Sequence, residues 1–339
     1  MLDFSHGGNI EQFANNIPCD ISEVIDLSSN INFVKPNINL NLNNINISTY
    51  PTYTKLYNKL ANNYNTTIDN LELFNGGSSA IFELFRTLKL NHCTIYSPAY
   101  LEYKKAAITF NYEYDLINRF TNINRAVKEN SLVVFVNPST PDGKHYDIEY
   151  YLEAWDKLGC TILVDESFLD FTNYKSVLKY INKYKKLYIL KSMTKYYSCA
   201  GIRCGIIISN KTNIQKLKHN TAQWKISALD SEFLIQAIND DVFKKTSKVI
   251  NIKNHELLFN VLNNFTFIKT VYPSDANFFL VKLHNTTAFK LQKHLKLFKI
   301  MIRDCSNFDF LDDTYIRLAV KDEKSIYSLK RAFDNYYLS

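Results

Sequence analysis

Residues 191–205 read KSMTKYYSCAGIRCG and lie between two apolar runs, 187–190 and 205–208. A lysine in a pocket with a second cation nearby has a lowered pKa and can form a Schiff base, which makes Lys195 a candidate nucleophile. Ser192 and Arg203 could bind one phosphate together, with Arg203 as a forked donor. For any one of these residues taken singly, a solvated basic loop is the simpler interpretation.

Apolar runs alternate with helical patterns through the middle of the chain. The expected buried strands are 94–96, 132–136, 161–164, 187–190 and 205–208. Between them, 80–88, 100–110 and 148–158 carry apolar residues at helical spacing, and Gly159 follows the last of these as a C-cap. This alternation predicts an α/β fold with a mostly parallel central sheet and helices on both faces. Ligands of such sheets bind beyond the carboxyl ends of the strands.

Three further groups of polar residues stand at the ends of expected strands or at the start of a helix. Residues 75–79, NGGSS, precede a helix, where free backbone N–H groups attract anions, although a plain N-cap would look the same. Residues 137–143, NPSTPDG, predict a rigid turn that holds Asn137 outward, or else an ordinary loop. Asp165 ends a buried strand, so its carboxylate needs a metal, an arginine or a protonated heterocycle as partner. An internal salt bridge would serve equally.

The pattern changes after about residue 220. Residues 230–260 are largely helical in pattern, followed by apolar runs at 265–271, 278–282 and 315–320, a helix near 287–295 and a final helix. We therefore expect a large domain at 46–222 and a smaller α+β domain at 223–339. The irregular first 45 residues are too long for a structureless loop inside a compact domain. We expect residues 1–45 to form an arm that packs on the small domain or on a neighbouring subunit.

Composition excludes several classes of protein. The 339 residues are 46% hydrophobic, which excludes a disordered chain, and no apolar run is long enough to span a bilayer. The net charge of +7 comes from 40 basic and 33 acidic residues spread along the chain, so we expect no nucleic-acid partner and no membrane contact. The six cysteines are widely spaced without a C-x-x-C pair, so we expect no metal site and a cytoplasmic protein with reduced thiols.

Four elements, in this order and spacing, resemble those of the fold-type I pyridoxal-phosphate enzymes of the aminotransferase class I/II family. They are N-P-x-x-P-x-G at 137–143, D-E at 165–166, S-x-T-K at 192–195 and G-x-R-x-G at 201–205. The resemblance extends over nearly the whole chain. It implies pyridoxal 5'-phosphate as cofactor, Lys195 as its Schiff-base lysine and Asp165 as the partner of its ring nitrogen, which keeps the ring protonated as an electron sink. The other cofactor-binding residues that it implies are Asn137 at the ring hydroxyl, Gly77, Ser78, Ser192 and Arg203 at the phosphate, Tyr100 stacked on the ring, and Tyr50 at the phosphate of a neighbouring subunit.

Three more segments narrow the resemblance to the threonine-phosphate decarboxylases of cobalamin biosynthesis. They are HGGN at 6–9, DLSSNIN at 26–32 and IRDCSNF at 302–308. Phe168, where many relatives carry a tyrosine, also fits this group. The substrate-binding candidates are His6, Gly7, Asn9, Asn30, Asn32, Arg303 and Arg317. A Gly-Gly turn in a loose terminus and structural ion pairs of the two arginines are the alternative interpretations.

The resemblance predicts an enzyme that decarboxylates a small phosphorylated amino acid and assembles as a homodimer. The expected substrate is L-threonine O-3-phosphate, or L-serine O-phosphate, which lacks one methyl group. A methyl group changes binding by only about 1–3 kcal/mol. The first alternative is a histidinol-phosphate aminotransferase, which needs an amino acceptor such as 2-oxoglutarate. The second is a non-catalytic ligand-binding module on the same fold.

Overall fold

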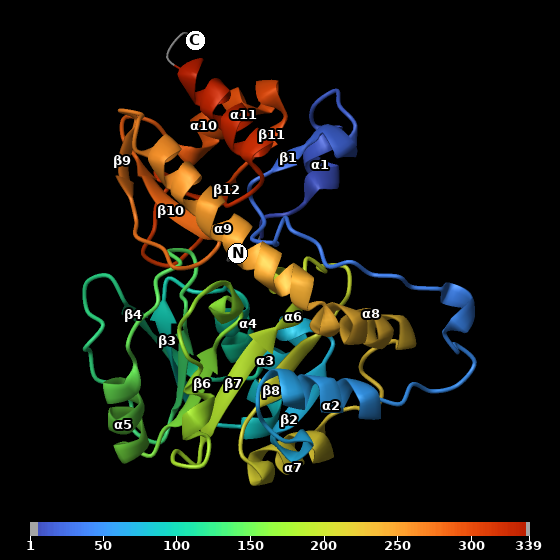
Figure 1. Ribbon diagram of the computed structural model, residues 1–339. Coiled ribbons are helices and arrows are strands. Elements are labelled where there is room, and N and C mark those ends of the chain that lie inside the picture. Colours follow the sequence, from blue (N-terminus) through green and yellow to red (C-terminus); the bar gives the residue numbers. More distant parts are fainter. Residues whose placement is uncertain (1–5, 337–339) are drawn as a thin grey trace.

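A seven-stranded sheet forms the centre of the larger part of the molecule in the computed structural model, which describes residues 6–336 (Figure 1). Its strand order is β2-β8-β7-β6-β5-β3-β4, and only β8 runs antiparallel to its neighbours. The mostly parallel α/β sheet predicted from the sequence is therefore confirmed. The strands are β2 (Leu71–Phe74), β3 (His92–Ser97), β4 (Glu113–Asn118), β5 (Leu132–Val136), β6 (Thr161–Asp165), β7 (Leu187–Ser192) and β8 (Gly205–Ile208).

Helices cover both faces of this sheet because its inner strands alternate between two apolar faces. Val133 and Phe135 pack on one side with α2 (Thr54–Asn63), α5 (Glu149–Lys157) and α8 (Ala228–Asn239). Leu132 and Val134 pack on the other side with α3 (Gly76–Leu88), α4 (Glu102–Thr109) and α7 (Lys211–Asn220). Burying a side chain of this size contributes about 1.5–3 kcal/mol, so the two layers hold the sheet rigid.

Two strands of the sheet were not expected from the sequence. The edge strand β4 pairs only with β3 and begins with exposed residues, so it lacks an apolar run. The four-residue β2 is fully buried but contains Glu72, whose carboxylate is paired with Lys225. Pairing with neighbouring strands defines both of them. The pattern of apolar and polar residues within each one does not by itself indicate a strand.

A four-stranded antiparallel sheet organises the smaller part, in the order β12-β13-β10-β9. Its strands are β9 (Ile268–Val271), β10 (Phe278–Leu283), β12 (Arg303–Asp304) and β13 (Tyr315–Ala319), packed with α10 (Ala288–Leu295) and α11 (Glu323–Asp334). The long helix α9 (Asp241–Leu262) reaches from the large sheet to this small sheet (Figure 1). The predicted helical region 230–260 is thus two helices, because Asp240 caps α9 by accepting from Phe243 N at 2.8 Å.

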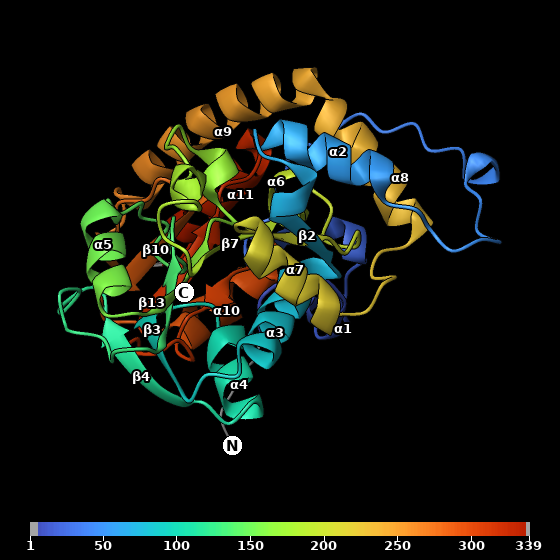
Figure 2. The ribbon, with the colours of Figure 1, turned by 90° about the horizontal axis from the view of Figure 1, so that it is seen from below.

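The N-terminal residues contain more structure than the irregular segment expected. Helix α1 (Ile10–Asn15) is followed by β1 (Ile25–Asp26), which pairs in parallel with β11 (Ile300–Met301) of the smaller part. The chain then runs outward past α8, where Asn37 N donates to Asp240 and Asn39 N to Gln236, and it projects from the body before α2 (Figure 2). The outermost residues of the expected arm and small domain, 1–5 and 337–339, lie outside the described residues. No helix within residues 6–336 has the length and apolarity to cross a membrane.

Candidate active site

A cavity of about 750 Å³ opens at the carboxyl ends of β6 and β7. It receives residues from both parts of the chain and from the N-terminal segment. The lining residues on the large-sheet side are Gly77, Ser78, Ile81, Tyr100, Asp165, Ser167, Leu190, Ser192, Thr194, Lys195, Ser198, Ala200 and Arg203. Those on the other side are Gly7, Gly8, Ile10, Asp26, Ser29, Ile31, Asn32, Phe33, Lys35 and Lys321.

The reversed direction of β8 explains why distant polar segments meet here. Gly205 is the first residue of β8, and it stands opposite Phe74 at the end of β2 and Ser192 at the end of β7. The backbones approach so closely that a Cβ on Gly205 would lie 2.7 Å from the Gly77 backbone nitrogen. An antiparallel strand therefore brings the residues just before it, including Arg203, to the edge where the parallel strands end.

An anion cradle forms where α3 begins. The free N–H groups of a helix N-terminus and the helix dipole attract negative charge, and α3 has thirteen residues. Gly76 has a φ of +81°, and a Cβ there would lie 2.5 Å from Arg203 Nη2, so only glycine admits the guanidinium at this place. The Ser192 hydroxyl lies 2.8 Å from that of Thr194, and the Ser78 hydroxyl 3.0 Å from that of Tyr100. These donors surround a space that suits a phosphate group.

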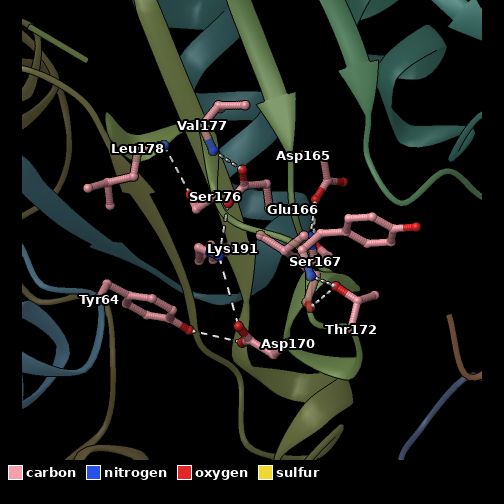
Figure 3. A network of polar contacts seen from close by, with 12 residues as sticks. Tyr64, Asp165, Glu166, Ser167, Asp170, Thr172, Ser176, Val177, Leu178 and Lys191 are labelled. Atoms are coloured by element: carbon pink, nitrogen blue, oxygen red, sulfur yellow. Dashed lines mark hydrogen bonds and ion pairs between the residues drawn. The ribbon is translucent and has the colours of Figure 1, made fainter. Parts of the chain in front are cut away.

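Asp165 is the last residue of β6, and both of its carboxylate oxygens accept hydrogen bonds. Tyr103 donates to Oδ2 at 2.7 Å, and Ser167 donates to Oδ1 through its backbone N–H at 2.9 Å and through its hydroxyl. Figure 3 shows the Ser167 contact. The carboxylate is buried, with 5% of the residue exposed, yet it lines the cavity. A buried anion that is held by donors in this way is ready to receive a cationic partner.

Lys195 lies in the short helix α6 (Met193–Tyr196), directly after β7, and its amine is 5.4 Å from the centre of the Phe168 ring. Burial lowers the pKa of Lys195 below its ordinary value, and the nearby Arg203 and Arg317 guanidinium groups lower it further, while Asp165 acts in the opposite direction. A lowered pKa increases the fraction of neutral amine, which is the nucleophilic form.

A buried ion pair lies on the opposite side of the same two strands (Figure 3). Lys191 Nζ is 2.9 Å from Glu166 Oε2 and 3.9 Å from Asp170 Oδ1, and Lys191 and Glu166 are both almost completely buried. Glu166 also accepts from the Ser176 hydroxyl at 2.6 Å and from Val177 N at 2.8 Å. Side chains alternate between the two faces of a strand, so Asp165 and Ser192 face the cavity. Glu166 and Lys191 lie on the opposite face, where their ion pair joins the ends of β6 and β7.

The N-terminal segment closes one side of the cavity. His6 Nε2 lies 3.1 Å from Glu102 Oε1, and the His6 ring is 5.1 Å from the ring of Tyr100. Gly8 N donates to the Ser28 hydroxyl at 2.8 Å. A Cβ on Gly7 would lie 2.7 Å from Ser28 O and 3.2 Å from Arg303 Cδ, so the backbone of this segment lies directly against Arg303.

Several predicted cofactor and substrate residues have their polar groups engaged by the protein itself. Asn137 is buried, and its amide exchanges two hydrogen bonds with the Tyr146 backbone, at 2.9 and 2.8 Å, outside the cavity that holds Lys195. Asn32 lines the cavity, but its amide donates to Tyr196 O at 2.9 Å and to the Ser247 hydroxyl at 2.7 Å. Asn9 caps α1 by accepting from Gln12 N at 3.1 Å.

The two predicted arginines are neighbours across β12 and β13, since Arg303 pairs with Arg317 in the register. Arg317 donates to the Thr140 hydroxyl and to Ser28 O, both at 3.0 Å, and burial lowers the pKa of Arg317 to about 10. Arg303 donates to Asp304 O and to Asn307 Oδ1, at 2.6 and 2.7 Å.

Asn30 and Tyr50 are not among the residues that line the cavity, although the neighbours of Asn30 in the chain, Ser29 and Ile31, are. Asn30 is buried, with its backbone oxygen bound by Asn277 at 3.1 Å. Tyr50 is 70% exposed and stacks on Trp224 at 3.9 Å between ring centres.

Sequence reasoning missed three residues that the structure brings to the site: Tyr103, Ser167 and Lys321. Tyr103 stands three residues after Tyr100, and Ser167 two residues after Asp165, so local spacing held a weak signal for both. Lys321 lines the cavity from the smaller part and donates to Ile31 O at 3.2 Å. Its position depends on how the two sheets are arranged, and no local pattern predicts that.

The residues present fit pyridoxal 5'-phosphate. The cradle at Gly76–Ser78, Ser192 and Arg203 suits the phosphate, Asp165 suits a protonated ring nitrogen, and Lys195 has the lowered pKa that a Schiff-base lysine needs. All of these groups line one cavity apart from Gly76, which lies at its edge against Arg203.

Comparison with known proteins agrees with this fit. The family model described as aminotransferase class I and II matches residues 22–332. The bifunctional adenosylcobalamin biosynthesis protein CobDQ of Leptospira interrogans is 27% identical over 98% of this chain, which spans 41% of that relative's length. A candidate threonine-phosphate decarboxylase of Caldanaerobacter subterraneus is 28% identical, with 99% of this chain and 95% of the relative covered.

Solved structures share the fold. The histidinol-phosphate aminotransferase of Clostridium acetobutylicum is 30% identical, with a TM-score of 0.80 over 91% of this chain and 98% of that one. The histidinol-phosphate aminotransferase of Sinorhizobium meliloti, solved with pyridoxal 5'-phosphate, has a TM-score of 0.80 at 14% identity, over 98% of this chain and 95% of that one. The relatives thus include proteins named for decarboxylation and for amino transfer.

Proposed function

Because the chain belongs to the aminotransferase class I and II family and uses pyridoxal 5'-phosphate, we propose that it decarboxylates a small phosphorylated amino acid. The proposed reaction converts L-threonine O-3-phosphate to (R)-1-amino-2-propanol phosphate and CO2. L-serine O-phosphate, which would give ethanolamine phosphate, is the close variant. The names of two relatives, CobDQ and the candidate threonine-phosphate decarboxylase, support this proposal.

The observation that carries the proposal is the placement of the N-terminal segment. His6 lies against Tyr100, and Gly7 lies against Ser28 and the Arg303 side chain, so an imidazole, the Gly7 N–H group and a guanidinium stand near one another beside the cavity that Gly7 and Tyr100 line. Such a set of donors suits a phosphate dianion in addition to the one that the cradle of α3 would hold. The proposed substrate therefore has its phosphate at this end of the cavity.

Orientation decides which bond of the substrate breaks. Bound pyridoxal phosphate supplies the electron sink, and the bond that breaks is the one held perpendicular to its ring. In the proposed enzyme, His6 and Arg303 hold the substrate phosphate, and Arg317 is the neighbour of Arg303 across β12 and β13. The substrate carboxylate is then left perpendicular to the cofactor ring. The ammonium form of Lys195, a stronger acid because the pKa of Lys195 is lowered, would donate the proton that replaces CO2 at Cα.

Product analysis on purified, cofactor-loaded protein tests the proposal. We expect CO2 and an amino-alcohol phosphate from L-threonine phosphate or L-serine phosphate without any keto acid, and the two rates rank the substrates. The variant His6→Ala should raise KM for the phosphorylated substrate about tenfold, the effect of losing one charge-assisted contact. A KM for the phosphorylated substrate that is unchanged in His6→Ala would show that the N-terminal segment does not hold the substrate.

The second candidate is a histidinol-phosphate aminotransferase, which the 30% identity and TM-score of 0.80 to the Clostridium acetobutylicum enzyme favour. This candidate predicts that the amino group passes from histidinol phosphate to 2-oxoglutarate. Glutamate is then formed, and no CO2 is released. Glutamate formed in that mixture, together with no CO2 from either phosphoamino acid, would replace the decarboxylase proposal.

A further inference from the structure

The first turn of α4 buries three consecutive polar side chains. Glu102 and Lys104 are only 8% and 9% exposed, and Tyr103 between them is completely buried. Burying charged groups side by side costs several kcal/mol per group unless each one is paired. Each of the three has a partner, and the partners come from three different parts of the chain: His6, Asp165 and Asp309.

The central contact reaches the cofactor site. The Tyr103 hydroxyl donates to Asp165 Oδ2 at 2.7 Å, on the oxygen that Ser167 does not occupy. Burial and the adjacent Asp165 carboxylate hold the pKa of Tyr103 well above its ordinary value, so the hydroxyl stays a donor throughout the working pH range. With donors on both oxygens, the Asp165 carboxylate is held in one orientation.

The two flanking contacts tie α4 to the parts that cover the cavity. On one side, Glu102 pairs with His6 of the N-terminal segment, and this hydrogen bond lowers the pKa of the Glu102 carboxyl. On the other side, Lys104 pairs with Asp309 in the loop between β12 and β13 of the smaller part. The helical turn that carries Tyr103 is therefore held from both sides of the site.

We propose that Tyr103 is a positioning residue for Asp165, and that the Glu102–His6 and Lys104–Asp309 pairs fix its place once the N-terminal segment and the smaller part lie over the cavity. The role is independent of the substrate. It rests on Asp165 holding the cofactor ring and not on the proposed decarboxylation.

Cofactor binding in the absence of substrate tests the positioning role. Tyr103→Phe removes only the hydroxyl, and we expect the dissociation constant of pyridoxal phosphate to rise about tenfold, the effect of one hydrogen bond to a charged group. We also expect kcat to fall while KM for the substrate stays unchanged, since Tyr103 acts only through Asp165.

Tyr112→Phe is the matched control. Its hydroxyl is also buried and hydrogen-bonded, donating to Phe85 O at 2.8 Å and accepting from Leu90 N at 3.0 Å, outside the lining of the cavity. Both variants should lower the unfolding midpoint to a similar degree, and only Tyr103→Phe should weaken cofactor binding. Equal cofactor affinity in the two variants would overturn the positioning role.

A double-mutant cycle tests the coupling through α4. Asp309→Asn breaks the pair with Lys104, and we expect it to weaken cofactor binding severalfold in the parent protein but not in the Tyr103→Phe background, because the effect passes through Tyr103. Additive effects, or no effect of Asp309→Asn in either background, would overturn the coupling. Neither outcome depends on which amino acid is turned over.

Discussion

Lys195 shows how single residues set the chemistry of this site. Its amine is influenced by one nearby anion, Asp165, and by two nearby guanidinium groups, those of Arg203 and Arg317. Burial and the two cations favour the neutral amine, while Asp165 favours the charged form, and the net effect is a pKa below the ordinary value for lysine. Arg203, the predicted phosphate-binding cation, thus also lowers the pKa of Lys195 and would have two roles in the site.

Arg203→Gln separates these two roles. Removing a nearby cation stabilises the ammonium form, so the pKa of Lys195 should rise, and the neutral fraction at a fixed pH should fall. The measurement is the pH dependence of Schiff-base formation between the apoprotein and pyridoxal, which has no phosphate to be held. The pH profile should move to higher pH, and affinity for pyridoxal phosphate should fall at least tenfold. Arg86→Gln, in an exposed pair with Glu83, is the control. A profile that does not move would contradict the electrostatic role.

At the scale of elements, the ends of β6 and β7 carry two functions on opposite faces. Asp165 and Ser192 line the cavity. Glu166 and Lys191 form the buried ion pair that Figure 3 shows. The pair joins neighbouring strands at the point where the site begins. An ion pair at 3% exposure is sensitive to the loss of one partner, because the other charge is left buried without compensation.

We therefore expect Glu166→Gln to lower the free energy of unfolding by about 3–5 kcal/mol, the usual cost of breaking a buried pair. Urea unfolding measures it. Glu153→Gln, which breaks the exposed pair with Lys157, should leave the midpoint unchanged. The double variant Glu166→Gln/Lys191→Met should recover part of the loss, since no charge is left unpaired. A Glu166→Gln midpoint equal to that of Glu153→Gln would show that Lys191 finds sufficient compensation from Asp170.

At the scale of the whole molecule, the site is assembled from segments far apart in the chain. The large sheet supplies Asp165 and Lys195, the smaller part supplies Lys321, and the N-terminal segment supplies Gly7 and Gly8. Tyr50 stands apart from all of these, exposed and stacked on Trp224. If the protein is the homodimer that the family resemblance predicts, Tyr50 would serve the cofactor phosphate of the neighbouring subunit.

Mixing two inactive variants tests this arrangement. Lys195→Ala and Tyr50→Ala subunits, mixed and reassembled, should recover about a quarter of the active sites, since half of random dimers are mixed and each restores one site. Activity of the mixture against each pure variant is the measurement. A mixture of Lys195→Ala and Asp165→Asn should recover nothing, because both residues serve their own subunit. No recovery with Tyr50→Ala would place Tyr50 outside the partner's site.

The class of fold and the chemical core of the site could be predicted from the sequence because they depend on local patterns. The apolar runs at β5, β6 and β7 identify buried strands, and the residues directly after parallel strands must meet at one edge of the sheet. Lys195, Asp165, Ser192 and Arg203 all follow or precede such strands, and the structure places them around one cavity.

Tertiary structure alone decided the rest, because it depends on contacts between segments whose own sequence is uninformative. The partner of Asp165 is Tyr103, from a helix 62 residues earlier, and Asn137 bonds to the Tyr146 backbone outside the cavity in which it was expected. Lys321 reaches the cavity only because α9 and β1 fix the small sheet beside the large one. A sequence determines which residues can be buried or charged, whereas the packing of distant elements determines which of them face each other.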